Sequence, residues 1–275
     1  MISVNTNIGA MAAVQNLSAT NRDLQVTQNA ISTGKKVSSA KDNGAIWTIA
    51  NKMSADVKAY DRVRESNERA GAILDTAIAA GESIMELLNE MKSKALAATQ
   101  SGLSTGSQGA LAADFAQLRD QITNVIANAS FDGANMVTAS NTASAISMGD
   151  ANGGSTITVA GVSLALGGGV VTVATGTAID STTNAAGALT LVNASITNLG
   201  TQLATWGAGA KRFEVHREFV SKLQDALNTG IGSITDADLS KESAKLQSLQ
   251  VKQQLGIQAL SIANSSAQSA LSLFR

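Results

Sequence analysis

The chain contains one histidine, His216, which is the first residue to consider for acid–base or metal chemistry. Glu214 and Glu218 flank it at two-residue spacing, which on a helix turns the three side chains toward different faces. This is not the His-Glu-x-x-His spacing of a zinc peptidase. Because the sequence has no cysteine and no second histidine, neither a Cys–His pair nor an ordinary zinc site can be assembled. We therefore interpret His216 as a packing or surface residue.

Other patterns that could support chemistry are incomplete. The glycine run at 167–169 is not followed by Lys-Ser or Lys-Thr, so it predicts a flexible turn rather than a phosphate-binding loop. A Gly-x-Ser-x-Gly elbow for a serine nucleophile is missing as well. Charges of both signs follow one another along a predicted helix, as expected for solvated ion pairs: Asp56, Lys58, Asp61, Arg62, Arg64, Glu65, Glu68 and Arg69. We predict no catalytic residue, no cofactor and no metal, and hence no enzyme.

Composition excludes further classes. The net charge is −1 and the pI is about 5.9, so the basic footprint of a nucleic-acid-binding protein is absent. Lys35, Lys36 and Lys41 form a small cluster that is typical of a solvated loop. No apolar run approaches the roughly 20 residues of a membrane span, and the first residues do not resemble a cleaved signal peptide. We expect neither nucleic acid nor membrane as a partner, and export, if it occurs, without a cleaved signal.

The aromatic content is only 3%, and the sequence contains no proline. Bulky core residues are therefore scarce, and long helices need not be interrupted. We interpret Trp47 and Trp206 as packing anchors rather than as a platform for a ligand.

Long helices are predicted at both ends of the chain, over residues 1–34 and 235–275. In each, the stripe positions alternate three- and four-residue steps, which places them on one face of a helix. The first stripe consists of Ala10, Ala13, Leu17, Thr20, Leu24, Thr27 and Ile31. The second consists of Leu239, Glu242, Leu246, Leu249, Gln253, Gly256, Leu260, Ala263, Ala267, Ala270 and Phe274. We expect these stripes to pack against each other or against another copy of the chain.

A further line of residues lies beside the C-terminal stripe: Val251, Leu255, Gln258, Ile262, Ser269 and Leu273. Two adjacent lines on one helix require more than one neighbour, and their small and polar members make each contact weak. Ordering the chain costs about 1–2 kcal/mol per residue. We therefore expect the terminal helices to be disordered in the monomer and to fold on assembly with many copies.

Between the ends, helices are predicted from about 45 to 100, from 111 to 129 and from 184 to 227. Residues 138–183 are rich in Gly, Ser, Thr and Asn. Within them, apolar and polar residues alternate over 156–159 and 162–166, which predicts a β-hairpin, and another strand is predicted at 170–174. Thr235 and Asp238 resemble a capping box for the last helix. The predicted fold class is mainly α, a long antiparallel helical hairpin or coiled coil from both termini with a small β-hairpin lobe in the middle.

Several sequence motifs together resemble one family. They are SVNTN at 3–7, STGKKVSSAKD at 32–42, FDG at 131–133 and ALSLFR at 270–275. This combination is similar to bacterial flagellin and covers roughly residues 1–137 and 185–275. DNGAIW at 42–47, ESAKLQSLQVKQQL at 242–255 and GIQALSIAN at 256–264 resemble in particular the short flagellins of stalked alphaproteobacteria.

The resemblance implies a secreted structural subunit that polymerises into the flagellar filament for swimming motility. Its implied partners are identical or near-identical flagellins, the hook-associated junction and cap proteins, the flagellar type III export apparatus and a flagellin chaperone. The implied domains are core helices at 1–44 and 235–275, a surrounding shell at 45–137 and 181–234, and a variable β-rich outer segment at 138–180. The core residues expected to drive self-assembly are Leu17, Leu24, Ile31, Leu246, Leu249, Leu260, Leu271 and Phe274.

Many flagellins are recognised by an innate Toll-like receptor through a surface on their long helices. Matching without gaps from the FDG motif puts Glu90, Lys94 and Asp114 of this chain at that surface. Glu90 and Lys94 depart from the basic and leucine residues usual in the family, so we expect weak recognition.

Three alternatives stay open at this point. The hook–filament junction protein shares the terminal helices but normally has a longer middle, and the Leu-Phe-Arg ending favours flagellin. An enzyme on a helical scaffold, such as a flagellin with an inserted metallopeptidase, would need the missing His-Glu-x-x-His motif. A membrane-active amphipathic helix would carry more Lys and Arg on its polar face.

Overall fold

A computed structural model describes residues 6–140 and 142–272, with side chains described as far as residue 265 in the last helix. The elements are α1 Ile8–Thr33, α2 Gly44–Ala98, α3 Thr105–Asn128, β1 Ala145–Met148, β2 Thr156–Val159, α4 Thr182–Thr235 and α5 Leu239–Ser272. The mainly α fold class with a small β element in the middle is thereby confirmed. The chain forms two compact units, one of the described residues up to 55 and from 225, the other of residues 56–224.

Polar side chains begin each helix by accepting hydrogen bonds from the first free backbone N–H groups. Oδ1 of Asn7 accepts from the N–H of Ala10 at 3.0 Å, and Oδ1 of Asn43 accepts from Ile46 at 3.1 Å. Ser104, Ser181 and Asp238 have the same role at α3, α4 and α5. The expected capping box is therefore wrong in part: Asp238 caps α5, whereas Thr235 is the last residue of α4 and its hydroxyl donates to the carbonyl of Ile231.

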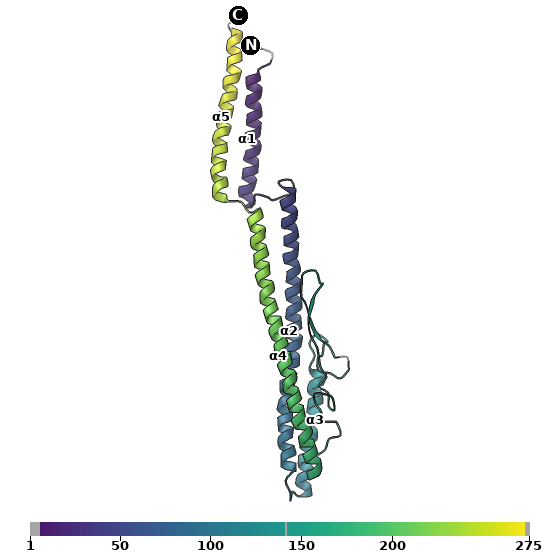
Figure 1. Cartoon of the computed structure of the whole chain (residues 1–275). Helices are drawn as coiled ribbons and strands as arrows, with labels where there is room; N and C mark the ends of the chain where they lie inside the picture. The colour runs from purple at the N-terminus through teal and green to yellow at the C-terminus, as the bar shows by residue number, and fades with distance from the viewer. Residues whose placement is uncertain (1–5, 141, 273–275) are drawn as a thin grey trace. The chain divides into compact units, whose positions relative to one another are not determined.

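In the first unit, α1 and α5 lie side by side (Figure 1). The residues that follow α1 are bonded to the junction of α4 and α5. The N–H of Lys36 donates to the carbonyl of Thr235, the last residue of α4, at 2.7 Å, and the N–H of Ala237 donates to the carbonyl of Gly34 at 2.9 Å. Gly34 has φ +69°, a left-handed conformation that suits glycine at a helix C-terminus. These bonds fix where α1 and α5 begin their pairing.

The short connection from α1 to α2 is organised by Asp42. One carboxylate oxygen, Oδ2, accepts from the N–H and hydroxyl groups of both Ser38 and Ser39, at distances from 2.9 to 3.1 Å. The hydroxyl of Ser38 contributes most to holding the pKa of Asp42 below its ordinary value. The Ser-Ser-Ala-Lys-Asp motif is thus a turn closed by its own acidic residue.

The core of the second unit lies between α2, α3 and α4. Its largest fully buried side chains include Leu74, Ile84, Leu88, Met91, Phe115, Ile122, Leu199 and Trp206. Nε1 of Trp206 donates to the carbonyl of Ala160 at 3.1 Å, so this tryptophan anchors the middle segment to α4, as expected. Trp47 differs: it lies in the first unit, is 38% exposed, and is not a buried packing anchor.

The predicted β-hairpin has the wrong partner strand. β2 pairs antiparallel with β1, with Ala145 opposite Val159 and Met148 opposite Thr156, whereas 162–166 is not a strand. The N–H of Val162 donates to Met136 at 2.9 Å, which directs this segment away from β2. The strand expected at 170–174 is also absent, because the N–H of Thr172 donates to Oγ of Ser195 on α4.

Candidate functional site

The seam between α1 and α5 is the first candidate site, and it brings the two predicted terminal stripes together. Nε2 of Gln253 donates to Oδ1 of Asn21 at 2.7 Å. Farther toward the start of α1, Leu17 lies against Gly256, where an added Cβ would come within 3.3 Å of the leucine Cδ1. Since the partner number rises as the α1 number falls, the helices are antiparallel. The glycine allows their close approach.

The predicted self-assembly residues lie at different depths in this seam. Leu24 and Leu249 are buried, at 8% and 6% exposed. Leu17, Ile31, Leu246 and Leu260 are half-buried. The side chain of Leu271 and the whole of Phe274 lie outside the described residues. Up to residue 265, the seam therefore buries few large side chains.

A second apolar stripe on α5 is not covered by α1. Val251, Leu255 and Ile262, which we call the open stripe, are 55%, 58% and 69% exposed. α1 also exposes apolar side chains, at Ile8 and Met11 among others. Single exposed apolar residues are normal, but a row at helical spacing marks an interaction surface. The spacing in the sequence predicts this second line, and the structure leaves it without a partner within the described part of the chain.

Two polar atoms in the seam were not anticipated from the sequence. Thr27 is completely buried, and its hydroxyl has no hydrogen-bond partner among the described residues. Oε2 of Glu242 is also buried without a hydrogen bond there, and Nζ of Lys245 lies 3.6 Å from it. A buried polar group without a partner, such as the Thr27 hydroxyl, costs about 1–3 kcal/mol, whereas Glu242 keeps the Lys245 ammonium as an ion-pair partner. The available signal was that both residues are polar members of otherwise largely apolar stripes.

The three residues matched to the receptor surface come together in the second unit. Glu90 and Lys94 on α2 and Asp114 on α3 line one surface cavity of about 440 Å³. Nζ of Lys94 lies 2.5 Å from Oδ2 of Asp114, and the two side chains are 38% and 55% exposed. An exposed ion pair contributes about 0.2–1 kcal/mol. The pair thus joins α2 to α3 at the surface of the second unit.

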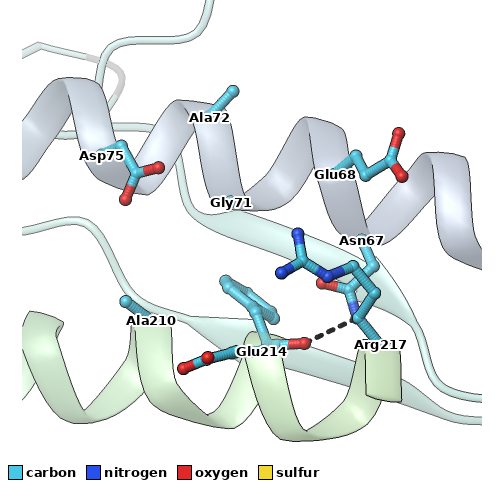
Figure 2. Close-up of a pocket in the computed structure, with 9 residues that line it drawn as sticks. Asn67, Glu68, Gly71, Ala72, Asp75, Ala210, Glu214 and Arg217 are labelled. Atoms are coloured by element: carbon cyan, nitrogen blue, oxygen red, sulfur yellow. Dashed lines mark hydrogen bonds between the residues drawn. The ribbon is translucent and has the colours of Figure 1, made fainter. Parts of the chain in front are cut away.

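Another cavity, of about 350 Å³, lies between α2 and α4 in the same unit. Figure 2 shows Glu68 and Asp75 on one side of it, with Arg217 extending between the two helices. At its base, Nδ2 of the buried Asn67 donates to the carbonyl of Phe213 at 3.1 Å (Figure 2). The residues described as lining it include no histidine and no hydroxyl side chain. Its best-defined polar contact is the one that joins the helices.

His216 occupies a packing position on α4. Its Nε2 is buried without a hydrogen-bond partner in the described part of the chain, and its ring centroid lies 6.3 Å from that of Phe219. Across residues 6–140 and 142–272, no group of three or more potential ligands is gathered where it could hold a metal ion. None of the helices described there has a stretch long and apolar enough to cross a membrane.

The paired terminal helices and the open stripe together are typical of subunits that assemble into helical polymers. Comparison with known proteins specifies which polymer. Residues 4–142 match the bacterial flagellin N-terminal helical region, and residues 189–274 match the bacterial flagellin C-terminal helical region. The chain therefore belongs to the bacterial flagellin family.

Individual flagellins are similar to this chain over nearly its whole length. The chain is 49% identical to flagellin FljM of Caulobacter vibrioides, over 99% of this chain and 98% of that protein. It is 38% identical to a flagellin of Brucella melitensis, with full coverage of both chains. A crystal structure of Bacillus cereus flagellin matches with a TM-score of 0.50 at 21% identity, over 56% of this chain and 88% of that one. This last similarity concerns the fold.

Proposed function

We propose that this protein is a flagellin whose α1–α5 pair and open stripe build the core of the flagellar filament used for swimming. Family membership supports the filament-subunit function and favours it over the hook–filament junction protein. The observation that carries the structural part is the open stripe, since Val251, Leu255 and Ile262 stay exposed although α1 is already in place. A neighbouring copy supplies the missing partner.

In this proposal the segments have separate roles. Residues 1–44 and 235–275 form the core layer, 45–137 and 181–234 the surrounding helical shell, and 138–180 the outer segment. The eight residues predicted from the sequence to drive self-assembly stabilise the core layer. Among the six whose side chains are described, Leu24 and Leu249 contribute most because they are the buried ones. No catalytic role is proposed for any residue.

The proposal also includes folding on assembly. α1 and α5 comprise 26 and 34 residues, and ordering them costs about 1–2 kcal/mol per residue. Against this cost, the seam buries few large apolar side chains and also buries the polar atoms of Thr27 and Glu242. The pair is then ordered only when neighbours cover the open stripe. Circular dichroism of monomer and filament tests this: equal helix content in the two states would contradict it.

The decisive experiment replaces the open stripe without touching the seam. We expect the double variant Leu255→Gln, Ile262→Gln to remain monomeric at concentrations where the wild type forms filaments in negative-stain microscopy. Both side chains are exposed and belong to the first unit, so their replacement should leave the second unit folded. Lys252→Gln is the matched control, because it changes an exposed residue of the same helix outside the stripe. Normal filaments from the double variant would overturn the role of the stripe.

The remaining partners are proposed on the basis of family membership, and no site in the described part of the structure supports them separately. We propose export through the flagellar type III apparatus with the help of a flagellin chaperone, and placement between the hook-associated junction proteins and the cap in an extracellular filament. Secretion can be tested by locating the protein in culture supernatant of cells with and without a functional flagellar export apparatus.

For the innate receptor we propose weak recognition. Glu90 stands where a basic residue is usual in the family, and Lys94, paired with Asp114, stands where a leucine is usual. A receptor-reporter cell line should respond to this protein only at doses well above those of a recognised flagellin. A response at ordinary doses would contradict the assignment of Glu90, Lys94 and Asp114 as a divergent surface.

A further inference from the structure

The turn between β1 and β2 contains an Asn-Gly pair, Asn152–Gly153, in a setting that favours a spontaneous covalent change. Both residues are exposed, and Gly153 has φ +69°, so the peptide is in an open turn. The side-chain amide of Asn152 makes no hydrogen bond within the described residues; the backbone N–H of Asn152 donates to Oδ1 of Asp150 at 2.9 Å. The bond from the N–H of Gly153 to the carbonyl of Asp150 is long, at 3.3 Å.

We propose that Asn152 is a site of non-enzymatic deamidation in the folded protein. The backbone nitrogen of Gly153 gives its proton to solvent base and attacks Cγ of Asn152, forming a C–N bond and a five-membered succinimide. The Cγ–Nδ2 bond breaks, and the nitrogen takes up a proton and leaves as ammonia. Water then opens the ring at either carbonyl, which yields aspartate or isoaspartate. The missing Cβ of glycine makes its nitrogen the least hindered attacking group.

The sequence has one other Asn-Gly pair and one Asp-Gly pair, and the side chain before the glycine has a bonding partner in both. Asn43–Gly44 lies at the start of α2, where Oδ1 of Asn43 accepts from the N–H of Ile46, so ring closure there has to break the helix cap. Asp132 precedes Gly133, but its carboxylate lies 2.7 Å from Arg69. An ionised, paired carboxylate is a poor electrophile. The fold therefore selects Asn152 among the three.

Conversion would change the turn itself. Asp150 accepts from the N–H groups of Gly154 and Asn152, and the bond from Gly154 contributes most to lowering the pKa of Asp150. A new carboxylate at 152 adds a like charge two residues from Asp150. Isoaspartate also lengthens the main chain inside a turn that is closed by the N–H of Gly149 donating to Ser155 at 2.8 Å. The ladder between β1 and β2 should loosen.

The test incubates the full chain at mildly alkaline pH and follows both Asn-Gly sites by peptide mapping, with fragmentation that separates aspartate from isoaspartate. Breaking an N-cap bond corresponds to about a fivefold slower reaction. In the folded protein Asn152 should deamidate no more than about fivefold more slowly than in the denatured chain. Asn152→Gln should abolish the aspartate and isoaspartate products at this position. Slower conversion than this, or none, would overturn the proposal.

Asn43 provides the internal comparison, measured on assembled filaments in which α1 and α2 are ordered. There it should convert at least about fivefold more slowly than Asn152, and in denaturant the two rates should become similar. Equal rates in filaments would refute selection by the fold. Filament formation is scored separately by microscopy, so a failure of the proposed function is seen independently of the chemistry at Asn152.

Discussion

Replacing Thr27 by valine should strengthen the pairing of α1 with α5. Thr27 is completely buried in the seam, and its hydroxyl has no hydrogen-bond partner among the described residues. Valine keeps the β-branched shape and has a similar helix propensity, so the main change is the removal of a buried polar group. Such a group costs about 1–3 kcal/mol, which corresponds to about a 5- to 150-fold shift in the equilibrium between open and paired helices.

The matched control is Thr20→Val, about two turns earlier on the same stripe. The hydroxyl of Thr20 donates to the carbonyl of Asn16 at 2.9 Å. Its removal therefore deletes a hydrogen bond, whereas Thr27→Val removes a hydroxyl that has no partner among the described residues. Helix content of the monomer should therefore rise for Thr27→Val and stay level or fall for Thr20→Val. Circular dichroism measures the first effect, and the temperature at which filaments depolymerise should rise with it. Equal behaviour of the two variants would refute the reasoning.

Further predictions concern other parts of the chain. Deleting residues 260–275 should abolish polymerisation while the helices of 45–137 still form, as seen by microscopy and circular dichroism; filaments of the truncated protein would contradict this. Because the folded pKa of Asp42 lies below its ordinary value of 3.8, its contribution to stability is fully present above that pH and is lost as the pH falls through the lowered pKa. An acid titration of filaments should show this loss for the wild type and a smaller one for Asp42→Asn. Trp206→Ala should destabilise the second unit by about 3–5 kcal/mol in chemical denaturation, since the ring is fully buried and its Nε1 bonds to Ala160; a change below about 1 kcal/mol would count against its role as an anchor.

The terminal helices were predictable because their spacing is local information. Leu24 and Leu249 stand in stripes that recur every three or four residues, and a helix with such a stripe has to bury it. The second line on α5 could be read in the same way. Which of the two lines meets α1 depends on the rotation of both helices about their axes, and the sequence does not state it.

The middle segment was less predictable because strand pairing is not local. Alternation identified 156–159 as a strand, but its partner 145–148 lies before it across a turn, and no short pattern distinguishes that choice from 162–166. Gly161 decides against the expected hairpin, since a Cβ there would overlap the carbonyl oxygen of Ala143. That close approach exists only once the surrounding segments are in place.

The buried polar atoms of Thr27 and Glu242 affect when the open stripe becomes available to a neighbour. A seam that buried leucines in place of Thr27 and Glu242 would pair α1 with α5 stably in a single chain. The open stripe would then be presented on an ordered helix in every free subunit, and exposed apolar rows on ordered surfaces promote uncontrolled association. Under the proposed folding on assembly, a weak seam avoids this, because the open stripe is then presented on an ordered helix only where a neighbouring copy covers it. Strengthening the seam through Thr27→Val should therefore also shorten the lag before monomers polymerise. An unchanged lag alongside a more helical monomer would contradict this, because order in the seam would then not set the rate of nucleation.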